Sequence, residues 1–195
     1  MNDEQIRSFI AIELPSELKS GLLQLQTELK LSGYTFVKWV ATEGIHLTLK
    51  FLGNIPSLKI DEITGAMVNA IEGISPFQLE TAEPGVFPNL KRPNVFWVGI
   101  AGDLDKLALL QKRIDNVLEQ RGFPREKHTF NPHLTLARIR EDASPQNRQD
   151  FGKLVAKKSF TVKYQLKVNV ISLMRSQLLP GGATYHRLSE VTLSA

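Results

Sequence analysis

The sequence contains no cysteine and no long hydrophobic run. Without cysteine the chain has no disulfide, no thiolate nucleophile and none of the usual thiolate ligands for structural zinc or an iron–sulfur cluster. The N-terminal segment MNDEQIRSFIAIELP starts with acidic residues and is apolar only briefly, so it resembles neither a secretory signal nor a membrane anchor. These absences favour a cytoplasmic protein.

The composition is that of an ordinary globular protein, with 42% hydrophobic and 23% charged residues among 195. This length suits one substantial core or two small lobes that share one, so we expect a single domain over residues 1–195. The net charge of +4 and the pI near 9.3 suit a polyanionic partner without requiring one. The basic residues form only short clusters, which more often belong to a solvated surface.

Helical and strand patterns alternate along the chain. Apolar residues at helical spacing predict one helix that begins near Ser16 and two more that cover about residues 58–74 and 103–120. A shorter helix is expected near 146–156. We predict an α+β fold built from two similar lobes, with no linker between them. The expected strands are, in chain order, residues 8–14, 37–40, 45–52, 77–80, 95–100, 130–139, 160–176 and 185–193.

Glycine and proline mark the expected breaks between these elements. Gly53, Asn54 and Pro56 are expected to end the strand at 45–52. The segment EPGVFPNLKRPN, residues 83–94, is expected to form a loop between two strands, and PGG at 180–182 a turn before the last strand.

The tetrapeptide HLTL occurs twice, at 46–49 and at 133–136, in a chain with four histidines. Side chains of a strand alternate between its two faces, so each copy buries its leucines and presents a histidine and a threonine on the other face. Strict alternation adds a third residue to each face of the first copy. The predicted histidine face is His46, Thr48 and Lys50, and the predicted buried face is Leu47, Leu49 and Phe51.

Two histidines that meet across a cleft can divide the proton transfers of a phosphodiester displacement. An imidazole titrates near neutral pH, so one can take a proton from the nucleophile while the other gives one to the leaving oxygen. A threonine hydroxyl two residues along can donate a hydrogen bond to the anionic oxygens. Neither motif contains the carboxylates that a catalytic magnesium requires, and no Gly-rich phosphate loop precedes a lysine, so we expect no metal and no cofactor.

Each His-x-Thr motif taken alone has an alternative interpretation without a catalytic role. A single His-x-Thr strand is more often a half-exposed edge position than a catalytic site. The occurrence of the same pair twice, in comparable positions of two lobes, favours the catalytic reading. His128 and His186 have no matching threonine and are expected to be surface or packing residues.

Several segments in the same order resemble the two-histidine (2H) phosphoesterases, and within them the RNA 2′,3′-cyclic phosphodiesterase branch, also called the 2′-5′ RNA ligase or LigT-like family. The resemblance covers nearly the whole chain. The lead-in ATEG, residues 41–44, lacks prolines often found there in the family, which affects only the expected shape of that loop. The matching segments are RSFIAIELP, VKWV followed by IHLTLKFLG, GVFPNLKRPNVFWVGI, FNPHLTLARI and SLMRSQLLPGGATYHRL.

The resemblance implies a bilobal, pseudo-symmetric fold in which two antiparallel-rich sheets flank a central cleft and helices lie outside. It implies hydrolysis of a 2′,3′-cyclic phosphate to a 2′-phosphate, with His46 as proton donor to the leaving 3′-oxygen and His133 as the base that activates water. Sequence alone does not order acid and base, because the two motifs are nearly identical. The reverse reaction would join a 2′,3′-cyclic phosphate to a 5′-hydroxyl as a 2′-5′ linkage.

The resemblance also implies phosphate contacts by Thr48, Thr135 and Arg138. Strict alternation places Arg138 on the leucine face, so it reaches the cleft only if the strand ends or bulges near Ala137. Lys50 is a candidate to contact the phosphate or to flank the cleft.

Other residues near the groove have two readings each. Lys91 and Arg92 are candidates to follow an RNA backbone, with a solvated loop as the alternative. Phe51, Phe87 and Tyr185 are candidates to stack a base, with a core position as the alternative.

The expected partner is RNA or a nucleotide with a 2′,3′-cyclic phosphate terminus, tRNA halves included, bound by a monomer that has no membrane partner. Two other functions stay open at this point. One is a non-catalytic module that binds RNA termini or assists tRNA processing, in which the histidines only hold a phosphate. The other is a 2H enzyme that acts on ADP-ribose 1″,2″-cyclic phosphate or on 2′-5′ oligoadenylate.

Overall fold

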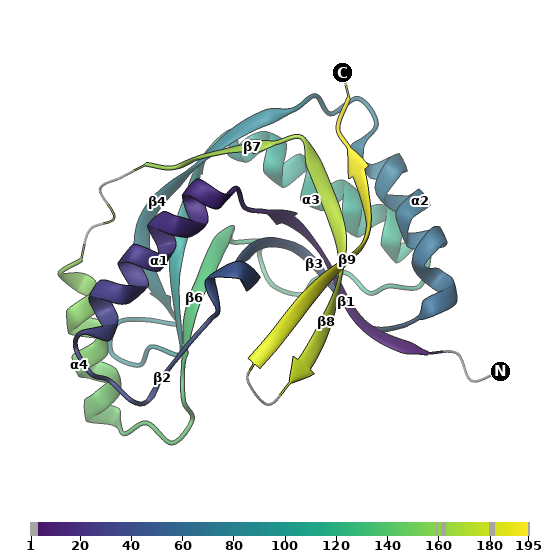
Figure 1. Cartoon of the computed structure of the whole chain (residues 1–195). Coiled ribbons are helices and arrows are strands. Elements are labelled where there is room, and N and C mark those ends of the chain that lie inside the picture. The colour runs from purple at the N-terminus through teal and green to yellow at the C-terminus, as the bar shows by residue number, and fades with distance from the viewer. Residues whose placement is uncertain (1–3, 159, 161–162, 180–181, 195) are drawn as a thin grey trace.

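The computed structural model describes residues 4–158, 160, 163–179 and 182–194, and in this part of the chain nine antiparallel strands form one curled sheet (Figure 1). Its order is β7-β4-β5-β6-β3-β1-β8-β9, with β2 paired to β6. The strands are β1 (Gln5–Glu13), β2 (Val37–Trp39), β3 (His46–Pro56), β4 (Phe77–Phe87), β5 (Val95–Gly102), β6 (His133–Ile139), β7 (Gln165–Val168), β8 (Val170–Leu179) and β9 (Gly182–Thr192).

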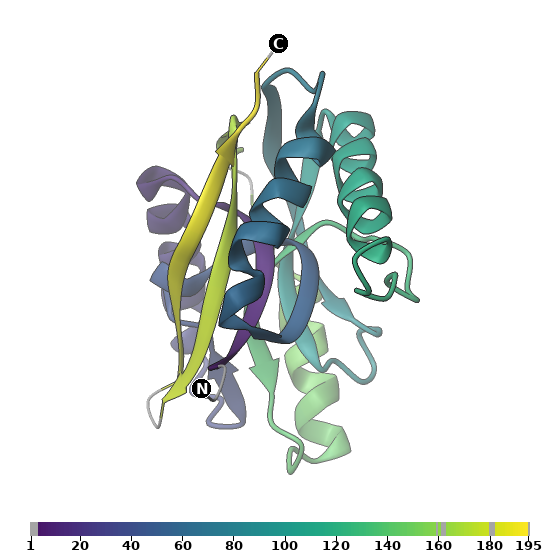
Figure 2. The ribbon, with the colours of Figure 1, turned by 90° about the vertical axis from the view of Figure 1, so that its right-hand side faces the viewer.

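The two HLTL words lie on the two central strands and divide the sheet into two halves. The His46 half is β3, β1, β8 and β9, and the His133 half is β6, β5, β4, β7 and β2. Figure 1 shows helices α1 (Ser16–Lys30) and α4 (Pro145–Ala156) at one end of the molecule and α2 (Ile60–Ile71) and α3 (Leu104–Glu119) at the other. Figure 2 shows α2 and α3 side by side, with β9 next to α2.

The chain crosses between the halves several times. Helix α1 follows β1 of the His46 half but packs on the His133 half, where the Gln26 side-chain amide donates to the carbonyls of Val40 and Leu136 at 2.8 and 3.0 Å. Helix α3 follows β5 of the His133 half but contacts β3. Each half is therefore completed by a helix that the chain brings over from the other half.

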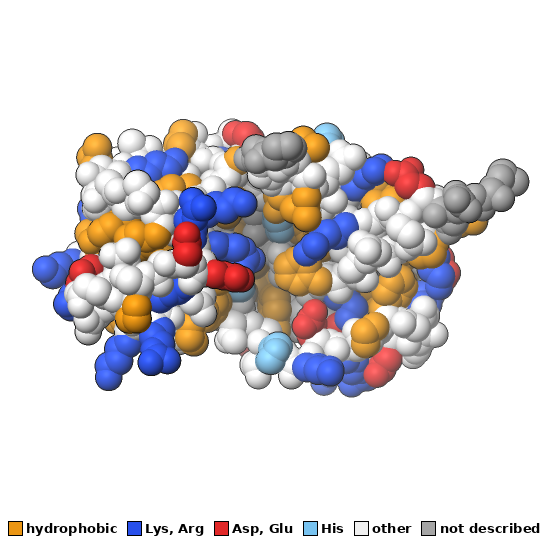
Figure 3. Space-filling view, turned by 90° about the horizontal axis from the view of Figure 1, so that it is seen from below, with side chains coloured by type: hydrophobic (Ala, Val, Ile, Leu, Met, Phe, Trp, Pro, Cys, Tyr) orange, Lys and Arg blue, Asp and Glu red, His pale blue; other side chains and the backbone are white. Residues whose placement is uncertain are grey.

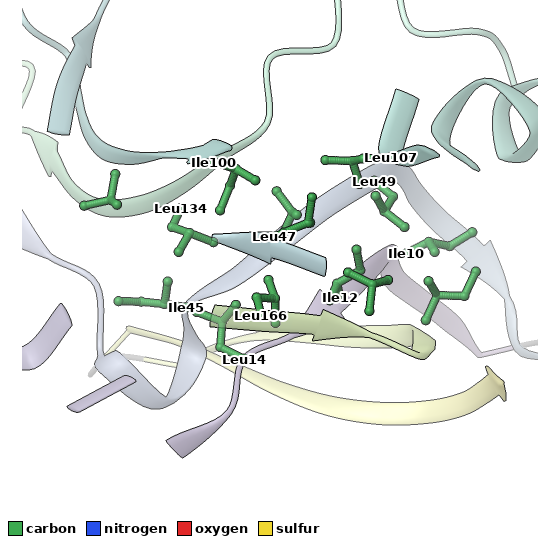
Figure 4. Close-up of a cluster of buried hydrophobic side chains, with 14 of the residues drawn as sticks. Ile10, Ile12, Leu14, Ile45, Leu47, Leu49, Ile100, Leu107, Leu134 and Leu166 are labelled. Atoms are coloured by element: carbon green, nitrogen blue, oxygen red, sulfur yellow. The ribbon is translucent and has the colours of Figure 1, made fainter. Parts of the chain in front are cut away.

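The leucines of both HLTL words point into the core on the helix-covered side of the sheet. Leu47, Leu49, Leu134 and Leu136 are at most 2% exposed. Figure 4 shows Leu47, Leu49 and Leu134 in one cluster with residues of β1, β5 and α3. The helical stripes predicted for α1 and α3 are buried except at Leu104, the first residue of α3, which is 40% exposed. The buried members are Leu18, Leu22, Leu25, Leu29, Leu107, Leu110, Ile114 and Leu118.

The α+β fold with helices outside is confirmed, and three details of the prediction are wrong. The two expected sheets are joined into one, because β3 and β6 pair at Leu47 and Leu134. Strand β3 continues to Pro56, since Gly53 adopts φ +73° and lets the strand bulge against β1 where a break was expected. Residues 83–87 of the expected loop belong to β4, and residues 84–87 pair with β5.

Two further expectations concern the turn before the last strand and membrane-spanning segments. Pro180 and Gly181 of the expected turn lie outside the described residues. Among the helices of the described ranges, none has the length and apolar character needed to cross a membrane.

Candidate active site

The two HLTL words lie on neighbouring antiparallel strands and meet at their first leucines. Leu47 of β3 is the partner of Leu134 of β6. In an antiparallel ladder this register places His46 beside Thr135 and Thr48 beside His133, all four on the face opposite the leucines. Diagonal neighbours in a regular ladder are about 7–8 Å apart, which leaves room for a phosphate group between the two imidazoles. All four side chains are partly exposed.

Each word carries a β-bulge at its fourth residue. Against β1, Thr48 pairs with Ala11 and Lys50 with Ile10, so Leu49 is the extra residue. Against β5, Thr135 pairs with Trp97 and Ala137 with Phe96, so Leu136 is the extra residue. A bulge places two consecutive residues toward the same face and reverses the alternation beyond it. Residues beyond each bulge therefore point to the face opposite the one that strict alternation predicts.

The bulge at Leu49 turns Lys50 away from the cleft, so its predicted place on the histidine face is wrong. Lys50 is 2% exposed and lies on the core side of β3. Its ammonium group forms an ion pair with Asp115 of α3 and donates to the Pro124 carbonyl at 2.8 Å. Gln111 donates to the other oxygen of the Asp115 carboxylate at 3.0 Å. Lys50 thus connects β3, α3 and the segment before β6 and is not available to a ligand.

The same bulges turn the next residue of each strand toward the cleft. Arg138 is exposed, and no ion pair or hydrogen bond joins its guanidinium to another residue in the described part of the chain. The bulge that its predicted role required is thus present, one residue earlier than Ala137. Phe51 is 58% exposed and lies 6.1 Å from the Phe9 ring, on the cleft face and not in the core as strict alternation predicted.

Both histidines are held by the same local hydrogen bond. The Nδ1 atom of His46 is 2.8 Å from the Gly44 carbonyl oxygen, and that of His133 is 2.7 Å from the Asn131 carbonyl oxygen. Because a carbonyl only accepts, Nδ1 carries the hydrogen in both rings. Each neutral imidazole therefore has its Nε2 lone pair free, and each imidazolium has its Nε2–H free to donate.

The His46 ring packs in a small apolar cluster on the cleft face. It stacks on Phe9 at 4.4 Å between ring centroids and meets the edge of Tyr185 at 5.0 Å. Burial lowers the pKa of His46 below its usual value, while the hydrogen bond to Gly44 and the charge of Glu13 act in the opposite direction. On balance these surroundings favour the neutral form of this histidine.

Glu13 lies directly across the β1–β3 ladder from His46. Its carboxylate accepts hydrogen bonds from Ser172 at 2.6 Å and from Arg187 Nε at 2.8 Å. Burial alone would raise the pKa of Glu13, but the hydrogen bonds from Arg187 and Ser172 outweigh burial and lower it. Glu13 therefore stays ionised beside His46 at neutral pH.

The surroundings of His133 have a different character. Phe87 meets the His133 ring edge-on at 5.0 Å, and Trp97 lies 6.4 Å away. The residue across the ladder from His133 is Gly99, which has no side chain. Trp97 lies over the backbone of the neighbouring strand at Gly85, where any side chain would collide with the indole. The position across the ladder from His133 therefore carries no carboxylate like the one beside His46.

The face that carries the histidines is hollowed between the two halves. Figure 3 shows histidine side chains in the hollow and lysine and arginine side chains on both sides of it. Within the described ranges, the Thr48 and Thr135 hydroxyls make no hydrogen bond to another residue. No group of three or more His, Asp or Glu side chains in these ranges has the arrangement to hold a metal ion.

Sequence reasoning missed Phe9, Glu13 and Trp97 as neighbours of the two histidines. The only signal for Glu13 was an acidic residue at the end of the apolar run SFIAIEL. Two of the three aromatic candidates contact one of the two imidazoles directly, Tyr185 to His46 and Phe87 to His133. Lys91 and Arg92 are exposed, and both backbone amides donate to the Asn89 side chain.

Comparison with protein-family models matches the chain twice to the LigT-like phosphoesterases, over residues 12–97 and over residues 98–185. Each match contains one HLTL word. The duplication seen in the two strands therefore extends over two consecutive repeats of the chain.

Curated relatives carry one description. An RNA 2′,3′-cyclic phosphodiesterase of Methanothermobacter thermautotrophicus is 31% identical over 93% of this chain and 95% of its own length. A protein of the same description from Aquifex aeolicus is 31% identical over 88% of this chain and 87% of its own.

Solved structures share the whole fold. A crystal structure of a Thermus thermophilus protein superposes with a TM-score of 0.73 at 26% identity and covers 96% of this chain and 98% of its own. The E. coli LigT structure in complex with 3′-AMP has a TM-score of 0.73 at 22% identity, with 98% of this chain and 100% of that chain covered.

Proposed function

The chain belongs to the LigT-like phosphoesterase family, and from this membership we propose that it is an RNA 2′,3′-cyclic phosphodiesterase that hydrolyses a terminal cyclic phosphate to a 2′-phosphate. The observation that carries the proposal is the pair of partly exposed histidines on adjacent strands of one sheet face, each with Nδ1 bonded to a carbonyl and Nε2 free. Two such groups on either side of one phosphorus atom can serve as base and acid of a single displacement.

The reaction needs two proton transfers and one bond exchange. His133 Nε2 takes a proton from a water molecule, whose oxygen bonds to phosphorus while the bond from phosphorus to O3′ breaks. His46 Nε2 gives a proton to O3′, which leaves a 3′-hydroxyl and a 2′-phosphate. The next turnover requires His46 to regain a proton and His133 to lose one.

The phosphate oxygens need donors that act as negative charge develops. Thr48 and Thr135 have free hydroxyls in the same layer of side chains as the two histidines, and Arg138 adds an unpaired guanidinium at the end of the second motif, as far as the described residues extend. Donors of this kind, held in place before the reaction, stabilise the transition state more than the ground state.

Glu13 supports the order of acid and base that the family resemblance implies. A carboxylate beside His46 favours its imidazolium form, the form that an acid must have, and Gly99 offers His133 no such charge. A bound anionic phosphate acts in the same direction and opposes the effect of burial on His46. The role of base then goes to His133, which has no carboxylate across the ladder.

The finer parts of the proposal concern cofactor, reversal and cellular setting. We propose that no metal takes part, because histidine, threonine and arginine supply the proton transfers and the charge stabilisation. The same residues run in reverse would join a 2′,3′-cyclic phosphate to a 5′-hydroxyl as a 2′-5′ linkage, with hydrolysis dominant in water. RNA fragments in the cytoplasm, tRNA halves among them, are the proposed substrates of a monomer.

A panel of cyclic phosphates assayed with and without EDTA tests these points together. It comprises nucleoside 2′,3′-cyclic phosphates, an RNA oligonucleotide with the same terminus, ADP-ribose 1″,2″-cyclic phosphate and 2′-5′ oligoadenylate, with products identified by phosphorus NMR. We expect turnover of the first two to a 2′-phosphate, unchanged by EDTA. Loss of activity in EDTA contradicts the metal-free mechanism, and preference for either of the last two compounds changes the substrate.

The same panel distinguishes an enzyme from a binding module. Binding of the RNA terminus without turnover of any compound would support the module. His128→Ala serves as the matched control for the histidine variants described below, because His128 is exposed and lies before the second motif.

A further inference from the structure

A pocket of about 910 Å³ lies at the edge of β4, between this strand, the end of α4 and the segment 89–91. The residues that line it include a tryptophan, an exposed leucine and two lysines. Gly85, Leu90, Lys91, Trp97 and Lys158 are among them.

The pocket lies near the candidate active site, two strands away along one rung of the sheet. Thr135 of β6 pairs with Trp97 of β5, which pairs in turn with Gly85 of β4. Two strand spacings amount to about 10 Å, so the pocket begins on the order of one nucleotide step from a phosphate held at Thr135. Phe87 lies between the two sites, with its ring 5.0 Å from both His133 and Trp97.

In the part of the chain that the structure describes, β4 is unpaired along part of its outer side. In the described ranges, β7 pairs with β4 over residues 77–80 and leaves residues 83–87 without a strand on their outer side. On the other half, β9 pairs with β8 along its whole length. A chain that leaves the cleft across Trp97 therefore meets an open pocket, whereas one that leaves across Ala11 meets a paired strand.

The pocket offers the two contacts that single-stranded RNA uses. Trp97 and Leu90, which is 46% exposed, present apolar surface to a base. Lys91 has no ion-pair partner in the described part of the chain, and Lys158 has a 3.4 Å pair with Glu28 that an RNA phosphate can replace. Glu83 also lines the pocket, and its carboxylate is engaged by the Phe160 amide at 3.3 Å.

We propose that this pocket binds the nucleotide that precedes the terminal cyclic phosphate of an RNA substrate. The base lies against Trp97 and Leu90, and the phosphate between the last two nucleotides lies near Lys91 and Lys158. This inference rests on the proposed function. It adds that the preferred substrate is an RNA chain and not a free nucleoside cyclic phosphate.

The test compares a nucleoside 2′,3′-cyclic phosphate with a short RNA oligonucleotide of the same terminus. We expect wild-type kcat/KM to be about tenfold or more higher for the oligonucleotide, because a stacked base and a phosphate contact each strengthen binding of the longer substrate. Lys91→Glu with Lys158→Glu should remove this preference and leave the mononucleotide rate within about twofold, since neither lysine touches the cyclic phosphate. It should also make the salt dependence of the oligonucleotide KM less steep.

Lys157→Glu is the matched control, one residue along the same segment and not among the pocket residues. Lys91→Glu alone is the second variant, because Lys158 also pairs with Glu28. Equal wild-type rates for the two substrates overturn the pocket proposal, as does an equal effect of Lys157→Glu. Absence of turnover on the mononucleotide as well contradicts the proposed function itself, so the two failures are distinguishable.

Discussion

The His46 and His133 strands share their tetrapeptide, their bulge and the hydrogen bond that holds the imidazole, yet the residues around them differ. Across the ladder His46 faces Glu13 and His133 faces Gly99. Beyond the bulge the cleft side receives Phe51 in one half and Arg138 in the other. The core side receives Lys50 in one half and Ala137 in the other, and the next strand presents Ala11 beside Thr48 and Trp97 beside Thr135.

The comparison separates what the duplicated framework supplies from what each half adds. In the proposed mechanism the shared residues supply two equivalent proton carriers and two hydroxyl donors, which is all that a symmetric phosphate needs. A cyclic phosphate is not symmetric, because one side receives water and the other releases O3′. The unshared residues place a carboxylate across the ladder from His46, an exposed arginine further along the strand of His133 and an open pocket on one side only.

The largest expected effect removes what the halves share. His46→Ala and His133→Ala should each lower kcat by about 10²–10⁴-fold, since each removes one proton transfer of a concerted step. The double variant should be little worse than either single variant, because the two groups act as a unit. Measured kcat with a nucleoside 2′,3′-cyclic phosphate checks this. Near-normal turnover by either single variant would refute the assigned roles, and His128→Ala should behave as wild type.

The next prediction concerns Lys50, the buried residue after the bulge of β3, where β6 has Ala137. Lys50→Ala leaves Asp115 without its cation in a largely buried site and should lower the free energy of unfolding by about 3 kcal/mol, as measured in urea. Lys50→Met combined with Asp115→Asn should recover much of this loss. The folded fraction of either variant should retain its kcat/KM. Loss of catalysis with an unchanged free energy of unfolding would contradict this structural role and support the earlier expectation that Lys50 acts in the cleft.

A smaller effect tests the two residues that the bulges turn outward. Arg138→Ala should lower kcat by about 10²-fold, because it removes a charged donor to the phosphate, and Arg138→Lys should restore only part of it. Phe51→Ala should mainly raise KM, and by less than about tenfold, because its ring offers contact surface and no charge. Steady-state kinetics of the three variants separate these expectations. Equal losses of kcat at both positions would contradict the difference between the halves.

The smallest effect concerns Glu13. Glu13→Gln should lower the pKa of His46 further, because the variant loses a carboxylate that favours imidazolium and leaves Arg187 with Glu190 as its remaining carboxylate partner. With His46 as the acid, the alkaline limb of the kcat/KM profile moves to lower pH, since activity requires the protonated form. Proton NMR titration of the imidazole signals reports the pKa directly. Movement of the acidic limb instead would reverse the roles, and Glu43→Gln is the exposed control.

Much of the fold and the central site could be predicted from the sequence because alternation holds up to the fourth residue of each HLTL word. Beyond that point Lys50 and Phe51 exchange faces, because a bulge adds one residue to a strand. No particular residue type marks such a bulge in the sequence. Arg138 follows the same rule, and its family role was consistent only with such a bulge. The bulge near Arg138 was anticipated from that role, and the one near Lys50 was not.

Long-range pairing explains the other misses. Glu13 and Trp97 lie at the site because β1 pairs with β3 and β5 pairs with β6. The register of these strand pairs cannot be predicted from local sequence patterns. Residues 83–87 contain proline and glycine that are typical of a loop, yet Gly85 is needed there because Trp97 occupies the space of a side chain. The glycine that indicated a loop therefore marks a close contact within the sheet.

The crossing of helices between the halves bears on how such a chain could have arisen. The two family repeats follow one another in sequence, but α1 of the first repeat covers the strands around His133, and α3 of the second covers the strand of His46. Neither repeat alone therefore closes its own core. A chain with a single repeat would therefore need a second copy to supply the missing helix.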